Sequence, residues 1–454
     1  MQPSALFGML AFAAAAAAVP KSPFGGKPGR PGSEAAINNL RHKIKNIVLL
    51  SMENRSLDNL LGGQKLKGLE NPIQNGPFCN PYNVTDPSFG QYCTQAKDYD
   101  SVTNDPSHSV TGNNFEFFGT FTPEDGAIPN NNGFIHEQVQ NYGTKETNHT
   151  VLALQVMDYY TEEQVPVMTS LVQNFLTFNH WHSDCPLSTN PNRFALVSGT
   201  TAGHGSNDAT FYTYTYNQSS IFQTLGEKNI SWLNYWDTQG GTGPEAAMFT
   251  WTAETNNKDK IVPMTQFYTD AASGKLPTFS YLNPSCCGVG TTSMHDSGLI
   301  SDGEAFIKQV YEALRASPQW EDTLMILTFD ESGGFHDHVP SPYAPRPDNL
   351  TYTEKAANGQ EYTFGFDRLG GRIPTFLISQ WTPAAFVEQK GTNAAGKTVS
   401  YSASSVLRTL GYLWDFEPYN PRVEAAASFE HLVQHKARRN VIEKLPTPKH
   451  FTDF

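Results

Sequence analysis

The stretch NIVLLSMENRSLDNLLGG, residues 46–63, begins as an uninterrupted apolar run and ends in polar side chains. A short apolar run without alternation predicts a strand that is buried on both faces, as in a parallel sheet. Glu53 and Asn54 stand directly after this run. In open α/β sheets, ligands bind beyond the carboxyl ends of the strands, so a functional site is expected at these two residues.

The stretch TLMILTFDESGG, residues 323–334, repeats this pattern, and Asp330 and Glu331 follow its apolar run. Either pair alone could simply cap a strand and face water. Two pairs on matching strands favour a shared site, because like charges this close are costly without a cation between them. Three carboxylates and one amide oxygen form a hard-oxygen set suited to Mg, Ca or Mn, and Zn also accepts it.

Further apolar runs alternate with helical periodicity along the chain. Strands are expected within 230–236, 276–284 and 372–379, and a helix capped by Ser301 or Asp302 over 301–320. Strands that alternate with helices predict an α/β fold, with a central mainly parallel sheet sandwiched between helices and long surface loops. The predicted organisation is a signal peptide (1–18), a linker (19–43), one catalytic domain (44–440) and a C-terminal tail (441–454).

Composition narrows the class of protein. The 454 residues carry a formal charge of −13 and no basic run, which argues against nucleic acid as a partner. The apolar run that ends near Ala18 predicts a cleaved signal peptide, with a retained anchor as the alternative because no Lys or Arg precedes the run. No other stretch is apolar enough to span a membrane. A secreted glycoprotein is therefore expected. Its acceptor motifs begin at Asn83, Asn148, Asn217, Asn229 and Asn349.

The five cysteines suggest disulfide bonds rather than a zinc site. Cys79 and Cys93 flank a short loop and are expected to pair. The neighbours Cys286 and Cys287 cannot easily bond to each other, so one of them is expected to pair with Cys185.

The stretch CPLSTNPNRFALVSGT, residues 185–200, predicts a loop that enters a helix, with Pro191 in the first turn. Thr189 would then lie at or beside the N-cap, where free N–H groups and the helix dipole favour a phosphate. A hydroxyl there, near a cation, could attack phosphorus and form a covalent intermediate. A plain capping role is the alternative, and Ser188 is a rival for either role.

Four loop histidines lie near the proposed site: His108, His295, His336 and His338. Histidine can donate to a phosphate oxygen or protonate a leaving group. A lone loop histidine is more often a surface residue, so this pattern alone decides nothing for His108 or His295.

Several segments together resemble a known family. They are ENRSLDNLLG, DPSHS, YYTEEQVPVMTSLVQNF, STNPNRFALVSGT, DESGGFHDHVPSP and RLGGRIPTFLISQW, in family order from about residue 44 to about residue 420. The combination resembles the phosphoesterase family of non-specific phospholipases C and certain acid phosphatases. That family looks like a branch of the alkaline-phosphatase superfamily, so the resemblance implies a central sheet flanked by helices.

The resemblance also implies roles for individual residues. It implies one divalent metal ion, bound by Glu53, Asn54, Asp330 and Glu331. Thr189 matches the nucleophile, and His108 and His295 match positions that hold the phosphate or assist the leaving group. Supporting positions around these groups are expected at Arg193, Asp337, His338 and Ser188. The chain departs from the family pattern at Leu187-Ser188, where Gly-Pro is frequent, and at His295-Asp296, where His-Pro is frequent.

The expected function is that of a secreted, metal-dependent phosphoesterase, which as a phospholipase C would release diacylglycerol and a phosphorylated head group. An acid phosphatase acting on small monoesters is the main alternative. A sulfatase-type or phosphonate-type hydrolase and a non-catalytic secreted binding protein are weaker ones. The expected partners are a phospholipid or a small phosphate ester, with transient contact at a membrane surface.

Overall fold

The computed structural model describes residues 29–237, 243–255 and 257–451. The predicted signal peptide lies outside these residues. A central eight-stranded sheet has the order β12-β4-β11-β8-β1-β7-β5-β6. Its strands, in that order, are Phe386–Glu388, Leu176–Phe178, Phe376–Ile378, Thr323–Phe329, Asn46–Met52, Phe279–Asn283, Trp232–Trp236 and Ile261–Pro263. Only β11 runs antiparallel to its neighbours, which confirms the prediction of a mainly parallel sheet.

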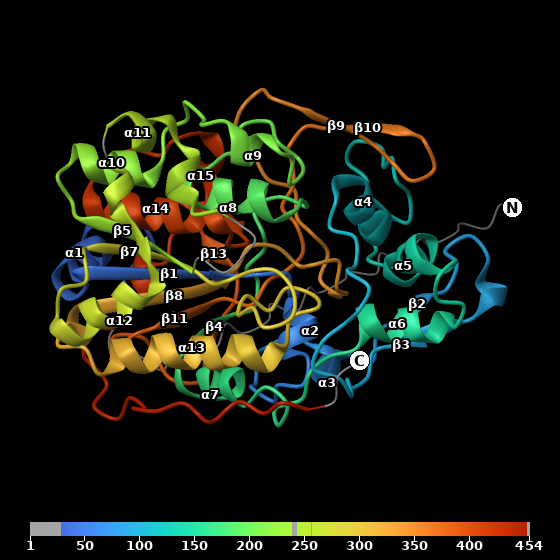
Figure 1. The fold of residues 1–454 in the computed structure, drawn as a ribbon, viewed down its shortest axis with the longest axis horizontal. Coiled ribbons are helices and arrows are strands. Elements are labelled where there is room, and N and C mark those ends of the chain that lie inside the picture. Colours follow the sequence, from blue (N-terminus) through green and yellow to red (C-terminus); the bar gives the residue numbers. More distant parts are fainter. Residues whose placement is uncertain (1–28, 238–242, 256, 452–454) are drawn as a thin grey trace, which may run out of the picture.

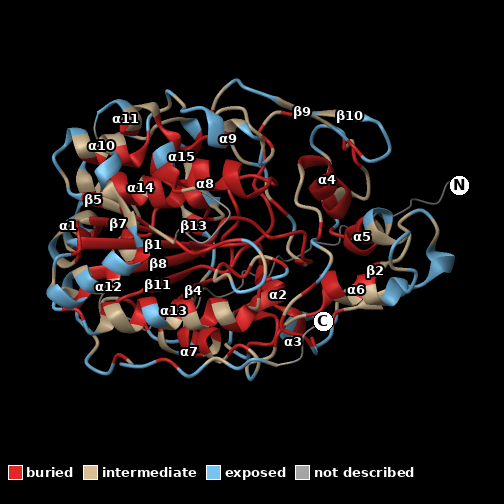
Figure 2. Ribbon diagram, in the orientation of Figure 1, coloured by how far each residue is buried: buried red, intermediate tan, exposed pale blue. Residues whose placement is uncertain are grey.

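Helices cover both faces of this sheet (Figure 1). One face carries α8 (Thr189–Ser198), α10 (Ile221–Glu227) and α14 (Ala403–Trp414). The other carries α7 (Pro166–Asn174), α12 (Met264–Ser273) and α13 (Ile300–Arg315). The central strands β4, β11, β8, β1 and β7 are buried throughout, as their colour in Figure 2 shows. This two-sided burial explains why β1 and β8 read as continuous apolar runs.

The register of β1 and β8 decides where the site lies. The two strands have equal length and pair in parallel from Asn46 opposite Thr323 to Met52 opposite Phe329. Both therefore end at the same edge of the sheet. The residues that directly follow them, Glu53 and Asp330, emerge side by side.

A side lobe, at the right of Figure 1, packs beyond this edge around its own apolar cluster. It consists of β2 (Cys79–Pro81), β3 (Gln91–Cys93), α4 (Val110–Phe118), α5 (Phe134–Tyr142) and α6 (His149–Met157). The shorter elements of the molecule are α2 (Leu57–Leu61), α3 (Pro72–Asn75), α9 (Thr210–Thr213), α11 (Thr250–Glu254), α15 (Pro421–Ala425), β9 (Tyr352–Lys355), β10 (Glu361–Phe364), β13 (Gly391–Thr392) and β14 (Thr398–Val399). None of the helices in the described part of the chain is long and apolar enough to cross a bilayer.

The expected linker is only partly a linker. Helix α1 (Glu34–Lys43) occupies its last ten residues and is capped by the Ser33 side chain. Leu40, on this helix, is buried in the main core, as is Ile44 just after it. The prediction of a linker over these residues was wrong, because an apolar residue every fourth position gives this short segment a face that packs on the core.

Two further expectations about local structure also need correction. Helix α13 begins at Ile300, so neither Ser301 nor Asp302 is its N-cap. The remote Asp100 takes that function, since its carboxylate accepts hydrogen bonds from the Ser301 backbone N–H at 3.0 Å and hydroxyl at 2.6 Å. A side chain so far away in sequence leaves no local signal.

The disulfide expectations were half right. Cys79 and Cys93 are bonded and join β2 to β3, as predicted. Cys286 and Cys287 are bonded to each other, and Cys185 is a buried free thiol. The expected bond to Cys185 was therefore wrong. Burial raises the pKa of the Cys185 thiol to about 12, so it stays protonated.

The C-terminal tail lies along α13. The carbonyl of Leu445 accepts a hydrogen bond from the Lys308 ammonium at 2.7 Å, and the carbonyl of Ile442 accepts one from the Tyr311 hydroxyl. Val441 and Leu445 are buried in the main core. This part of the tail belongs to the same folded body.

Candidate active site

The structure brings the four predicted ligands together at the shared ends of β1 and β8. The Asn54 N–H donates to Asp330 Oδ1 at 3.2 Å, and the Asp330 N–H donates to the carbonyl of Met52 at 3.1 Å. Glu53, Asn54, Asp330 and Glu331 are all buried. These residues directly follow two paired central strands, so the backbone that carries their side chains is rigid.

Asn54 and Glu331 each carry a buried side-chain oxygen that could serve as a ligand. Asn54 has a φ of +52°, in the left-handed region that asparagine tolerates better than most residues. Among the described residues, neither Asn54 Oδ1 nor Glu331 Oε1 has a hydrogen-bond partner, although both are buried. Such groups are costly without a ligand. Burial, together with the charge of Asp330, raises the pKa of Glu331 well above its usual range. The chemistry of these oxygen donors suits a divalent cation.

Arg193 joins this group to helix α8. Its guanidinium lies 3.0 Å from Glu53 Oε1, 3.0 Å from Asp330 Oδ2 and 3.2 Å from Glu245 Oε1, and all four side chains are fully buried. It also donates to the carbonyl of Ser51 at 3.0 Å. A planar guanidinium can make all of these contacts at once, whereas a lysine amine could not. Arg193 therefore fixes α8 against the ends of both strands.

Thr189 is the first residue of α8, and Ser188 is its N-cap. Thr189 and Arg193 are four residues apart and so lie on the same face of the helix, one turn from each other. The Asn192 side chain donates to the carbonyls of Leu187 and Ser188 at 2.8 Å and 3.2 Å, which fixes the approach to the helix. A threonine hydroxyl thus stands at a helix N-terminus, where an anion is stabilised.

The two predicted histidines meet beside Asp105. Donor atoms of Asp105, His108 and His295 all lie within 4.8 Å of one another. The two rings are 6.1 Å apart and edge to face. His108 Nδ1 donates to the carbonyl of Pro106 at 2.9 Å, which leaves Nε2 for other contacts. Burial lowers the pKa of His295, while the charges of Asp105 and Asp330 act in the opposite direction.

The departure at Asp296 has a structural explanation. Arg55, which follows the β1 ligands, lies with its guanidinium 2.9 Å from Asp296 Oδ1 and donates to the carbonyl of Met294 at 2.9 Å. All three residues are buried. Arg55 therefore ties the loop that carries His295 to the end of β1.

Asp337 and His338 form a neighbouring charged cluster with Asp58 and Arg372. Arg372 donates to Asp337 Oδ1 at 2.8 Å and to Asp58 Oδ1 at 2.9 Å. The His338 ring nitrogen lies 2.7 Å from Asp58 Oδ2, and its ring stacks on Phe78 at 4.1 Å. These contacts hold the 336–338 loop against the start of α2.

Besides Asp105, Asp58 and Arg372, sequence reasoning missed two further sets of residues at the site. Glu245 binds Arg193, and Asn283, at the end of β7, donates to Glu245 Oε2 at 2.6 Å. The polar residue that ends the buried strand β7 was the available signal. The bonded pair Cys286–Cys287 also lies against Glu53, with Cys286 Sγ 2.5 Å from Glu53 Oε2. Nothing in the spacing of the cysteines pointed to this contact.

Comparison with known proteins identifies the family. The sequence model of the phosphoesterase family matches residues 44–417. Non-specific phospholipase C6 of Arabidopsis thaliana is 34% identical over 86% of this chain and 72% of the relative. Non-specific phospholipase C1 of the same plant is 32% identical over 89% of this chain and 74% of the relative. The chain therefore belongs to the phosphoesterase family, whose members named here hydrolyse phosphoric esters.

More distant similarities extend to bacteria and to solved structures. The non-hemolytic phospholipase C of Burkholderia pseudomallei is 25% identical over 76% of this chain and 52% of the relative. Among solved structures, a phosphonate monoester hydrolase of Agrobacterium radiobacter aligns with a TM-score of 0.37 and 10% identity, covering 87% of this chain and 78% of that one. An alkaline-phosphatase-superfamily protein of Vibrio parahaemolyticus aligns with a TM-score of 0.33 and 11% identity, covering 58% and 63%.

Proposed function

We propose that this chain is a secreted, metal-dependent phospholipase C that uses Thr189 as its nucleophile. One arrangement carries the proposal. The buried guanidinium of Arg193 binds Glu53 and Asp330 from α8, the helix that begins at Thr189. Arg193 thus couples a hydroxyl at a helix N-terminus to a group of oxygen ligands, and phosphoryl transfer needs both of these parts.

Glu53, Asn54, Asp330 and Glu331 would hold one divalent cation. The unpartnered buried oxygens of Asn54 and Glu331 support this assignment. When bound, the cation supplies positive charge that offsets the phosphate oxygens and favours the ionised hydroxyl. Oxygen donors alone are compatible with Mg, Ca, Mn or Zn.

The proposed reaction has two steps. Thr189 loses its hydroxyl proton to water as Oγ1 attacks phosphorus, the bond from phosphorus to the glycerol oxygen breaks, and His108 or His295 gives a proton to the departing oxygen of diacylglycerol. Water then attacks phosphorus and loses a proton to the same histidine. The bond from phosphorus to Thr189 Oγ1 breaks, the phosphorylated head group leaves, and Thr189 Oγ1 takes a proton back from water, which restores the hydroxyl.

Two observations favour a lipid substrate. The relatives of highest identity named above are phospholipases C. Tyr212 and Tyr214 are also 54% and 69% exposed, and the Tyr212 hydroxyl accepts a hydrogen bond from Asn190, the residue after Thr189, at 2.9 Å. Exposed tyrosines suit contact with a membrane interface. These tyrosines are therefore placed to contact the membrane surface that contains a lipid substrate.

Secretion is supported by the apolar N-terminus, by the two disulfides and by the acceptor sites. The acceptor asparagines at 148, 217, 229 and 349 are exposed. Expression in a eukaryotic secretory host, followed by glycosidase treatment, tests this part. Protein recovered from the medium should fall in apparent mass, and protein retained unglycosylated in cells would contradict it.

Phosphorus NMR of the products tests the activity. The purified protein is incubated with phosphatidylcholine, phosphatidylethanolamine and a simple phosphate monoester. Release of phosphocholine or phosphoethanolamine supports a phospholipase C. Inorganic phosphate from the monoester, with both lipids unchanged, would instead make the protein an acid phosphatase.

A matched pair of variants tests the nucleophile. Thr189→Val keeps the shape of the side chain but lacks the hydroxyl, and Thr189→Ser keeps the hydroxyl. Turnover should be lost in the first and largely retained in the second, while both retain the bound metal. Unchanged turnover in Thr189→Val would overturn the assignment.

A further inference from the structure

The bonded pair Cys286–Cys287 lies between the solvent and one of the predicted metal ligands. Cys286 is 1% exposed, and its Sγ is 2.5 Å from Glu53 Oε2. Cys287 is exposed, and its Sγ is 3.5 Å from the same oxygen. The other carboxylate oxygen, Glu53 Oε1, lies 3.0 Å from Arg193. One side of Glu53 is therefore in contact with a covalent bond that thiols can cleave.

The surface around Cys287 is open. A side chain at Gly288 or Gly290 would meet nothing beyond its chain neighbours within 4 Å, and Val289 is 88% exposed. A small thiol can therefore reach Cys287 Sγ from the solvent. Cys286 Sγ, which is buried against Glu53, is then the sulfur that leaves.

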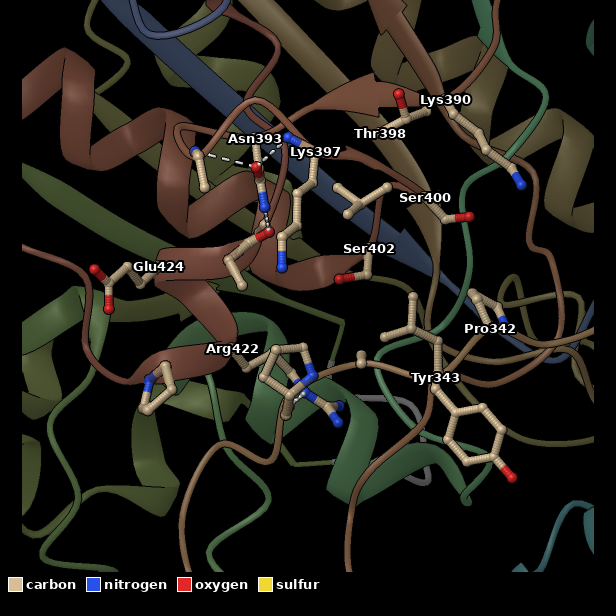
Figure 3. A pocket seen from close by; sticks show the side chains of 18 of the residues that line it. Pro342, Tyr343, Lys390, Asn393, Lys397, Thr398, Ser400, Ser402, Arg422 and Glu424 are labelled. Carbon is tan, nitrogen blue, oxygen red and sulfur yellow. Dashed lines mark hydrogen bonds between the residues drawn. The ribbon is translucent and has the colours of Figure 1, made fainter. Parts of the chain in front are cut away.

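The free thiol of the chain is kept apart from this exchange. Cys185 is fully buried, and its Sγ accepts a hydrogen bond at 3.2 Å from Arg422. Arg422 is among the residues that line the cavity of about 490 Å³ shown in Figure 3. Buried cysteines of this kind are unreactive. The pair Cys286–Cys287 can therefore open and close without rearranging to Cys185.

The loop that carries the pair is held by contacts that do not involve sulfur. The Ser285 N–H donates to Thr292 Oγ1 at 3.1 Å, and the Thr292 N–H donates to Ser285 Oγ at 3.0 Å. The Glu53 N–H donates to the carbonyl of Ser293 at 2.9 Å. The loop therefore keeps its place beside Glu53 when the sulfur–sulfur bond breaks, and the consequence is confined to the Glu53 side chain.

We infer that Cys286–Cys287 is a reversible redox modification site, and that its reduction weakens cation binding at Glu53. The inference rests on the cation site of the proposed function. A dithiol supplies two electrons and two protons. One of its thiols attacks Cys287 Sγ, the bond to Cys286 Sγ breaks, and its second thiol then releases Cys287 as the reductant closes its own disulfide. The two protons end on Cys286 and Cys287.

Reduction changes what the two sulfurs offer to Glu53. A disulfide carries no S–H group, whereas each thiol can donate one hydrogen bond. Both sulfurs already lie near Glu53 Oε2, so the new donors bind the oxygen that a cation would use. Changes to the groups that contact a metal ligand typically cost about 10–100-fold in metal affinity.

Calorimetric titration of the metal-free, full-length protein with Mn²⁺ tests the inference. Mn²⁺ prefers oxygen ligands to thiols, so the probe reports on the carboxylates. Protein reduced with dithiothreitol and freed of it without oxygen should bind Mn²⁺ at least about tenfold more weakly than oxidised protein, and reoxidation should restore the affinity. Cys79→Ala/Cys93→Ala, which lacks the other disulfide, is the matched control and should show the same loss on reduction.

Two variants separate the S–H donors from the bond itself. Cys286→Ser/Cys287→Ser keeps two donors but cannot form the bond, so it should bind Mn²⁺ weakly under all redox conditions. Cys286→Ala/Cys287→Ala has neither, and it should bind as the oxidised protein does. Equal affinity of the oxidised and reduced protein, a pair that dithiothreitol leaves intact, or strong binding by the serine variant would overturn the inference and leave the cation site in place. Absence of Mn²⁺ binding in every state would instead overturn the cation site, and this inference with it.

Discussion

Replacing Arg193 by methionine should be among the most damaging single changes in this protein. The variant keeps a long side chain but removes the cation that three buried carboxylates share, those of Glu53, Glu245 and Asp330. Removing one partner of a buried ion pair costs about 3–5 kcal/mol, because the remaining charge is left uncompensated. We expect at least this loss in the free energy of unfolding, measured by urea denaturation in the presence of a chelator so that no metal compensates.

The control is Lys65→Met, which removes an exposed ion pair to Glu162 at 3.3 Å. Exposed pairs contribute about 0–1 kcal/mol, so this variant should unfold almost as the parent does.

The pH dependence makes the reasoning refutable. Burial raises the pKa of Glu245, whereas Arg193 lowers it, so removing Arg193 should raise this pKa further. A carboxyl group whose pKa is higher in the folded than in the unfolded chain binds its proton preferentially in the folded state. Stability is then gained as pH falls. The cost of Arg193→Met should therefore be smaller at about pH 5 than at about pH 8. A cost below about 1 kcal/mol, or the same cost at both pH values, would refute the argument.

Three other predictions concern different parts of the molecule. Burial lowers the pKa of His182 from 6.5 to about 3, so the unfolded chain binds the proton first and stability falls as pH drops below 6.5. By about pH 5 this should cost ~2 kcal/mol, and His182→Gln should flatten that part of the stability profile. Replacing both Cys79 and Cys93 by alanine should cost about 3 kcal/mol in urea denaturation, and a reductant should then have little further effect on this hairpin. Asn54→Gly and Asn54→Ala should both weaken metal binding at least about tenfold in calorimetry, but only the alanine variant should also lose ~1–2 kcal/mol of stability to backbone strain.

The site at this edge of the sheet could be predicted because the residues that mark it are neighbours in the sequence. Each ligand pair directly follows a continuous apolar run, and the parallel pairing of β1 and β8 then brings Glu53 and Asp330 together. The same holds for Thr189, since Pro191 marks the first turn of α8. Residues whose position depends on one strand end or one helix start are accessible to this kind of reasoning.

Contacts between segments that are far apart in the sequence could not be predicted from the sequence. Glu245 begins a short 3₁₀ helix (Glu245–Met248), and its role is evident only from its contact with Arg193 on α8. Asp100 caps α13 across about two hundred residues of sequence. A bond between Cys286 and Cys287 was expected to be difficult on general grounds of geometry, so the buried thiol of Cys185 was assigned a partner that it does not have. In each case the contact forms only in the folded protein, and the spacing of residues along the sequence does not indicate it.

Helix α1 has a practical consequence for where this protein can be cut. The family match spans residues 44–417, yet α1 ends at Lys43 and packs against α14. The segment from 441 to 451 likewise lies on α13 beyond the other limit. A gene fragment trimmed to the matched residues would lack α1 and the 441–451 segment. It would therefore expose the apolar surfaces of α14 and α13 that these segments cover, and exposed surfaces of this kind promote aggregation. Fragments for expression or crystallisation should therefore include α1 and the segment from 441 to 451.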